Sequence, residues 1–274
     1  MSSIEGFNQH LQELRKRFLR IILVVGAIFV FVISCHLYPI DIAGFQLYYP
    51  TLDPVNNVAA QITNHMKKDL VPVGVQLIQT EPGQALFAQI YVAALVAIVV
   101  GMPVIIKELV DFIKPGLKER EIKVTRSIAL PALVLFIIGC IFSYFLIIPY
   151  MLEFLYSYGD ASGLITFLNI MDFITFVLQY LLAFGFSFQI PMIMYTVTMT
   201  GIINSNFWRK NLRFAILGIV VFGAIVTPDG SGVTMWFIAV PMMALYLGGM
   251  LVIEHKKSKR FKSQIKDKSL NGSQ

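Results

Sequence analysis

The chain has 274 residues, of which 57% are hydrophobic and 14% are charged, and its formal net charge is +6. Soluble domains carry about 25% charged residues, so this composition excludes an ordinary soluble domain and indicates an integral membrane protein. The positive charges do not indicate nucleic-acid binding, because they follow the sides of the membrane and do not gather on one folded face. Two cysteines, Cys35 and Cys140, cannot build a disulfide framework.

Six apolar segments predict transmembrane helices, because about 20 helical residues cross the roughly 30 Å hydrocarbon core. The fifth segment is the shortest, since Phe214–Val226 has only 13 uncharged residues, a length that also suits a buried or re-entrant helix. The predicted spans are about 18–37, 84–106, 127–152, 173–199, 212–227 and 233–253.

The distribution of Lys and Arg predicts the orientation of these spans. With six spans and both termini in the cytoplasm, 20 of the 22 basic residues lie on the cytoplasmic side, as the positive-inside rule requires. Without the short fifth span, the basic tail from Lys256 to Lys268 would lie outside. The short segment is therefore kept as a span.

The chain is interpreted as one six-span membrane domain, residues 1–256, followed by a basic, disordered cytoplasmic tail, residues 257–274. The segment between the first two spans, about Tyr38 to Gly83, is expected to form an ordered cap outside the membrane. Prolines inside the spans remove backbone donors and bend helices. The predicted fold class is therefore all-α, with the spans in a curved, cupped bundle; these prolines are Pro103, Pro131, Pro149, Pro191 and Pro241.

A charged segment, His10 to Arg17, comes directly before the first span. Leu11, Leu14 and Phe18 recur at helical spacing, which predicts an amphipathic helix with its charges facing water. Glu13 and Arg17 form an i,i+4 pair that contributes about 0.2–0.5 kcal/mol. From spacing alone, this pair and an orientation signal explain the segment.

Five motifs taken in order change that interpretation. The segment His10-Leu11-Gln12-Glu13-Leu14-Arg15-Lys16-Arg17 resembles the opening signature of the TatC family, the multispanning core of the twin-arginine protein translocase. Four further segments resemble its second span, first cytoplasmic loop, fourth span and last outer loop; they are Gly101–Ile105 with Pro103, Phe112–Glu121, Phe184–Pro191 and Thr227-Pro228-Asp229. The resemblance covers nearly the whole chain and implies the same six-span plan.

The resemblance implies a receptor in the cytoplasmic membrane of the cell for signal peptides that carry consecutive arginines. It implies small single-span TatA/TatB-type partner subunits, folded cargo driven by the proton-motive force, contact with lipid, and a homo-oligomer in the complex. Guanidinium groups pair with carboxylates, so the implied binding residues are Glu13 and Glu121, with Phe112, Arg15 and Arg17. Without the resemblance, Glu121 would be a solvated charge in a mixed loop.

Gln189 departs from the family pattern. Many members carry a glutamate at this point of the fourth span, whereas an amide cannot carry a proton. The predicted role of Gln189 is a hydrogen bond or packing across helices.

Two other classes of function are weighed against this one. An enzyme is not expected, because no His-Glu-x-x-His motif, nucleophile elbow or phosphate-binding glycine loop occurs in the sequence; no cofactor or metal is expected either. A small-solute secondary transporter would need polar groups at mid-membrane depth, where Gln179, Gln189 and a few hydroxyls are available. The segment ending at Cys35 also resembles a lipoprotein signal peptide, although an uncleaved first span suits the same residues.

Overall fold

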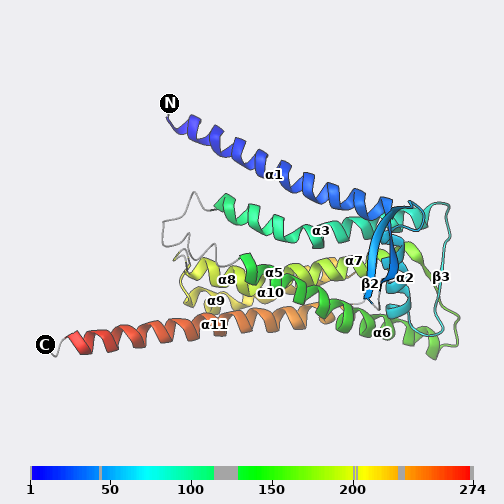
Figure 1. Cartoon of the computed structure of the whole chain (residues 1–274). Helices are drawn as coiled ribbons and strands as arrows, with labels where there is room; N and C mark the ends of the chain where they lie inside the picture. Colours follow the sequence, from blue (N-terminus) through cyan, green and yellow to red (C-terminus); the bar gives the residue numbers. More distant parts are fainter. Residues whose placement is uncertain are drawn as a thin grey trace. The chain divides into compact units, whose positions relative to one another are not determined.

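The computed structural model describes residues 2–42, 45–113, 129–199, 201, 203–227 and 232–271, with side chains for 11–41, 48–109, 111–112, 129–199, 201, 203–227 and 232–256. These residues are mostly helical (Figure 1). In chain order the elements are α1 (Ser2–Ser34), β1 (Cys35–Ile42), β2 (Phe45–Leu52), α2 (Val58–Leu70), β3 (Gln76–Ile78), α3 (Gln84–Ile113), α5 (Ala129–Phe142), the π-helix η2 (Ser143–Ile147), α6 (Ile148–Ala161), β4 (Phe167–Asn169), α7 (Ile170–Ser187), α8 (Ile190–Met199), α9 (Asn206–Lys210), α10 (Leu212–Val226) and α11 (Val233–Asn271).

Five helical segments of the described chain are long and apolar enough to cross a membrane, which agrees with five of the predicted spans. They are Leu11–Ser34, Gln84–Leu109, Ala129–Ala161, Ile170–Met199 and Val233–Lys256. Helix α10 is apolar but has 15 residues, so the sixth span stays a prediction. The first span ends earlier than expected, because Cys35 already begins strand β1, whereas α3 continues past the predicted end at residue 106 to Ile113.

The chain divides into two compact units, each built from two separate stretches of sequence. The first unit is Met1–Gly116 with Ile141–Leu182, and the second is Leu117–Cys140 with Ala183–Gln274. The predicted division into a membrane domain, residues 1–256, and a tail, residues 257–274, stays a prediction, as does the curvature of the bundle.

In the first unit, α1 lies along α3 (Figure 1). The two helices approach closely at Gly101, where a Cβ atom would lie 2.9 Å from Cγ2 of Val25. Val32 of α1 and Val92, Ala93 and Ala97 of α3 are buried. Small residues at such an interface allow the helix backbones to come close.

Four short strands correct the all-α prediction. Strands β1 and β2 form an antiparallel hairpin with Tyr38 opposite Tyr49, and β3 pairs with β4 in parallel. Pro39 and Pro50 lie inside the hairpin strands; a two-stranded ribbon tolerates proline because each strand has an unpaired edge. The expected cap between the first two spans therefore contains strands as well as helix α2.

Helix α2 begins where polar side chains satisfy its first backbone groups. Asn57, which is fully buried, accepts a hydrogen bond from the backbone N–H of Ala60 at 2.9 Å and donates to Oε1 of Gln89 on α3 at 2.9 Å. This N-cap ties α2 to the start of the second span. Just before it, the backbone N–H of Asn56 donates to Asp53, which lowers the pKa of that exposed carboxyl.

Two of the predicted prolines coincide with breaks in helical hydrogen bonding. Pro149 follows the π-helix η2, in which the N–H of Ile148 donates to the carbonyl of Ser143. Pro191 follows a break between α7 and α8, where the N–H of Gln189 donates to Phe186 at 3.0 Å. Proline lacks the donor that would continue the regular ladder, so both helices change their hydrogen-bond pattern at these positions. Pro103 and Pro241 lie inside continuous helices.

Helix α11 continues to Asn271, although the sequence analysis expects disorder from residue 257. The segment contains Lys, Gln, Arg and Leu, which have high helix propensity, and no Pro or Gly before Gly272. The helix that forms the last span therefore continues through the basic segment.

Close packing in the second unit depends on two glycines. A Cβ atom on Gly139 would lie 2.6 Å from the backbone oxygen of Phe184, and one on Gly185 would lie 2.7 Å from Cε2 of Phe136. A backbone atom cannot move aside as the end of a side chain can. Helix α5 and the end of α7 are therefore in contact at Gly139.

We expect Gly139→Ala to destabilise the purified protein by about 1–3 kcal/mol, because its methyl group would overlap the Phe184 backbone. Thermal unfolding in detergent measures this effect. Gly248→Ala on α11 is the matched control, since nothing lies within 4 Å of its Cβ, and it should change stability by less than about 0.5 kcal/mol. Equal melting temperatures for the two variants would contradict the close contact.

Candidate functional site

One face of α1 carries charged groups toward α3. Glu13, Arg17 and Arg20 recur at helical spacing with Val24, Ile28 and Val32, on the side that packs against α3. By contrast Leu11, Leu14 and Phe18 are exposed. The predicted amphipathic helix is therefore oriented differently from expectation: Glu13 and Arg17 face the neighbouring helix, and the apolar residues face outward.

Glu108 of α3 receives these arginines. Its side chain is 1% exposed, and its Oε1 lies 2.6 Å from Nη1 of Arg20, while its Oε2 lies 3.3 Å from Nη1 of Arg17. A carboxylate this deeply buried needs positive partners, because an unpaired buried charge is strongly destabilising. The two arginines supply them from α1, so the ion pairs hold the two helices together.

Arg17 connects Glu108 to Glu13. Its Nη2 and Nε lie 2.5 and 3.1 Å from Oε1 of Glu13, and its Nη1 lies 4.0 Å from Oδ2 of Asp111. Glu13 is 37% exposed and Arg17 is 19% exposed. The i,i+4 pair predicted from sequence is confirmed, but it is one part of a larger cluster. We call Glu13, Arg17, Arg20, Glu108 and Asp111 the charge cluster.

Sequence reasoning missed Glu108, Asp111 and Arg20 as members of the site. The partners of Glu108 lie 88 and 91 residues away in the chain, a distance over which spacing gives no information. A signal was nevertheless present, because a carboxylate follows a long apolar helix without an intervening turn residue.

The remaining predicted binding residues lie at the edge of this cluster or outside the described residues. Phe112 is half-buried on the last turn of α3, directly after Asp111, and Arg15 is exposed on α1. Glu121 and Asp229 lie outside the described residues, so their predicted roles stay predictions.

Gln189 lies at the break between α7 and α8, in the second unit. Its Nε2 donates to the backbone oxygen of Ala132 on α5 at 3.1 Å. The side chain thus makes an interhelical hydrogen bond of the kind expected from the sequence. Pro191 is the second residue of α8, and α3 continues through Pro103 without a break.

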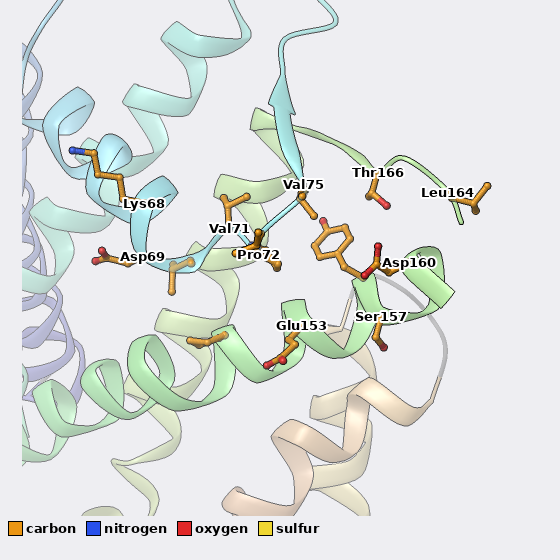
Figure 2. Close-up of a pocket in the computed structure, with 15 residues that line it drawn as sticks. Lys68, Asp69, Val71, Pro72, Val75, Glu153, Ser157, Asp160, Leu164 and Thr166 are labelled. Atoms are coloured by element: carbon orange, nitrogen blue, oxygen red, sulfur yellow. The ribbon is translucent and has the colours of Figure 1, made fainter. Parts of the chain in front are cut away.

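A hollow lies in the first unit, between the α2–β3 segment and α6 (Figure 2). Its volume is about 610 Å³. Its charged lining residues are Lys68, Asp69, Glu153 and Asp160, and Val71, Pro72 and Val75 supply apolar surface. Asp69 also accepts a hydrogen bond from the Tyr144 hydroxyl at 2.8 Å. These acids are exposed, so the hollow is a surface depression with no buried binding group among the described residues.

The long apolar helices and the charge cluster at the start of the first span define a multispanning helical membrane protein with a polar site at one end of its spans. A model of the family "Sec-independent protein translocase protein (TatC)" matches residues 9–241. The chain belongs to this TatC family.

Relatives and solved structures agree with that assignment. The chain is 55% identical over 253 residues to the Sec-independent protein translocase protein TatC of Cenarchaeum symbiosum, covering 92% of this chain and 96% of the relative. It is 34% identical to TatC of Synechocystis, covering 88% and 85%. A crystal structure of the twin arginine translocase receptor TatC matches with a TM-score of 0.70 at 26% identity, over 89% of this chain and 98% of that chain.

The hydrogen bond of Gln189 predicts how its removal affects stability. We expect Gln189→Leu to lower the free energy of unfolding by about 0.6 kcal/mol, the average for interhelical hydrogen bonds in membranes.

Thermal unfolding of this variant, beside the wild type, measures the effect. A stability of Gln189→Leu equal to or above that of the wild type would contradict the assignment of the amide as a donor to Ala132.

Proposed function

We propose that this chain is the signal-peptide receptor of a twin-arginine translocase, which binds Arg-Arg signal peptides at its cytoplasmic face. The observation that carries the proposal is Glu13, a partly exposed carboxylate on α1 that already binds a guanidinium group. Membership of the TatC family and the likeness to a solved twin arginine translocase receptor support it.

Glu13 has the chemistry that an arginine-containing ligand requires. Guanidinium groups form short, charge-assisted hydrogen bonds with carboxylates, frequently with two parallel N–H donors. Glu13 is 37% exposed, whereas Glu108 is 1% exposed. A ligand from solution therefore reaches Glu13, and Glu108 serves the chain's own arginines.

In the proposed site, Glu121 supplies the second carboxylate, Phe112 an apolar contact, and Arg15 and Arg17 the local charge balance. Phe112 lies on the last turn of α3, the helix that bears Glu108 and Asp111, and Glu121 comes nine residues later in the sequence. Consecutive arginines on one peptide would then bind two carboxylates, those of Glu13 and Glu121.

The proposal includes six spans with both termini in the cytoplasm, location in the cytoplasmic membrane, and assembly with small single-span TatA/TatB-type subunits that export folded cargo using the proton-motive force. The path for the cargo across the membrane would then form together with these partner subunits. A small-solute transporter is the alternative, and no described feature favours it over the receptor, because the charge cluster lies at the end of the spans and Gln189 is engaged with Ala132.

Topology can be measured with single cysteines. We expect a cysteine in place of Lys67, Asp160 or Ser231 to react with an impermeant maleimide from outside the cell. A cysteine in place of Lys118, Asn206 or Lys262 should react only after the membrane is opened, because basic segments remain in the cytoplasm. Each cysteine is introduced into a variant that carries Cys35→Ser and Cys140→Ser, so that it is the only one present. Labelling of position 262 in intact cells would rule out the short fifth span.

The pairing of Glu121 with an arginine of the signal peptide is tested by a double-mutant cycle between Glu121→Gln and an Arg→Gln signal peptide. Each charge-assisted hydrogen bond contributes about 1.5–3 kcal/mol, so Glu121→Gln alone should weaken peptide binding about tenfold or more. Direct contact predicts a coupling energy above about 1 kcal/mol, whereas additive losses would assign Glu121 an indirect role. An Arg→Lys peptide should also bind more weakly, because an ammonium group cannot form the planar two-donor contact.

A further inference from the structure

The charge cluster contains more acidic than basic groups. Three carboxylates, those of Glu13, Glu108 and Asp111, lie around the guanidinium groups of Arg17 and Arg20. Opposite charges in a partly buried site stabilise one another. The guanidinium group of Arg17 therefore has more than one carboxylate near it, those of Glu13 and Glu108 foremost.

Arg17 is bound to Glu13 and has two further acidic groups nearby, those of Glu108 and Asp111. Two of its nitrogen atoms contact Oε1 of Glu13, at 2.5 and 3.1 Å, whereas its third nitrogen lies 3.3 Å from Oε2 of Glu108 and 4.0 Å from Oδ2 of Asp111. Charge-assisted N–H···O bonds are most favourable at about 2.7–2.9 Å. The guanidinium is thus closely bound to Glu13 and only loosely bound to the two carboxylates of α3.

Arg20 holds Glu108, the nearer of these two acidic groups, in place. Its Nη1 lies 2.6 Å from Oε1 of Glu108, which leaves Oε2 of the same carboxylate facing Arg17. Because Arg20 is 60% exposed and Glu108 is 1% exposed, water competes for the arginine but hardly for the carboxylate. A small rotation of the Arg17 side chain toward Glu108 would shorten the 3.3 Å contact.

We propose that Arg17 is an internal competitor for Glu13 and that Glu108 is the positioning residue that receives Arg17 when a peptide guanidinium binds Glu13. This inference rests on the proposed function, since it assigns Glu13 to the signal peptide. The incoming arginine takes the place of Arg17 on Glu13, and Arg17 pairs more closely with Glu108 and Asp111. Peptide binding thereby strengthens the ion pairs between α1 and α3.

The test measures the affinity of a fluorescent twin-arginine signal peptide for the full-length chain in lipid nanodiscs. Glu108→Gln keeps the shape of the side chain but removes the charge that receives Arg17, so Arg17 stays on Glu13 and affinity should fall about tenfold. Arg17→Gln removes the competitor and should tighten binding by about threefold or more. In the double variant, Glu108→Gln should add less than a twofold change to Arg17→Gln, because its effect acts through Arg17.

Glu254→Gln is the matched control. It removes a different ion pair, in which Arg209 Nη2 lies 2.9 Å from Oε2 of Glu254 in the second unit, and peptide affinity should stay within twofold of the wild type. Thermal unfolding accompanies every variant. If Glu108→Gln does not fold, Arg17→Gln alone decides the matter, since weaker binding by that variant overturns the competitor role.

Different outcomes distinguish a failure of the proposed receptor function from a failure of the competitor role of Arg17. A wild-type chain that binds a twin-arginine peptide no better than its Lys-Lys counterpart overturns the proposed function. Selective binding by the wild type, together with equal losses from Glu108→Gln in the presence and absence of Arg17, overturns only the competitor role, because Glu108 then acts as a structural residue independent of Arg17.

Discussion

The buried carboxylate of Glu108 is the constraint on which the arrangement of α1 and α3 depends. A charge that is 1% exposed must be paired, and both of its described partners, Arg17 and Arg20, come from α1. The ion pairs fix the register of the two helices. The close approach of Gly101 to Val25 fixes the distance between them. Glu13, one helical turn before Arg17, is held by the same guanidinium and presented partly to solvent.

The second unit depends instead on close backbone packing and on a hydrogen bond between helices. Pro191 interrupts the ladder where α7 ends and α8 begins, and Gln189 in this break donates to Ala132 of α5. An amide suffices for that bond, and a titratable group is not required for it. The same unit brings α5 against α7 at Gly139, where only glycine fits. Its architecture therefore rests on backbone geometry, whereas the first unit depends on charge.

Many features of the fold and part of the charge cluster could be predicted from the sequence. The others could not, for physical reasons. Apolar length located the long helices, and i,i+4 spacing located the pair of Glu13 and Arg17, because both signals are local. The pairing of Glu108 with Arg17 joins residues 91 positions apart, which spacing cannot reveal. The hairpin was not predicted, since Pro39 and Pro50 lie inside its strands and proline is rare in strands other than edge strands.

Cross-linking from a bound signal peptide shows whether the charge cluster at the α1–α3 contact receives it. A signal peptide with a photoreactive group in place of the residue beside its arginine pair would be irradiated with the full-length chain in nanodiscs, and the attachment sites mapped by mass spectrometry. We expect attachment to α1 around Glu13 and to the last turn of α3 at Phe112. Attachment confined to the second unit, on α10 or α11, would contradict it.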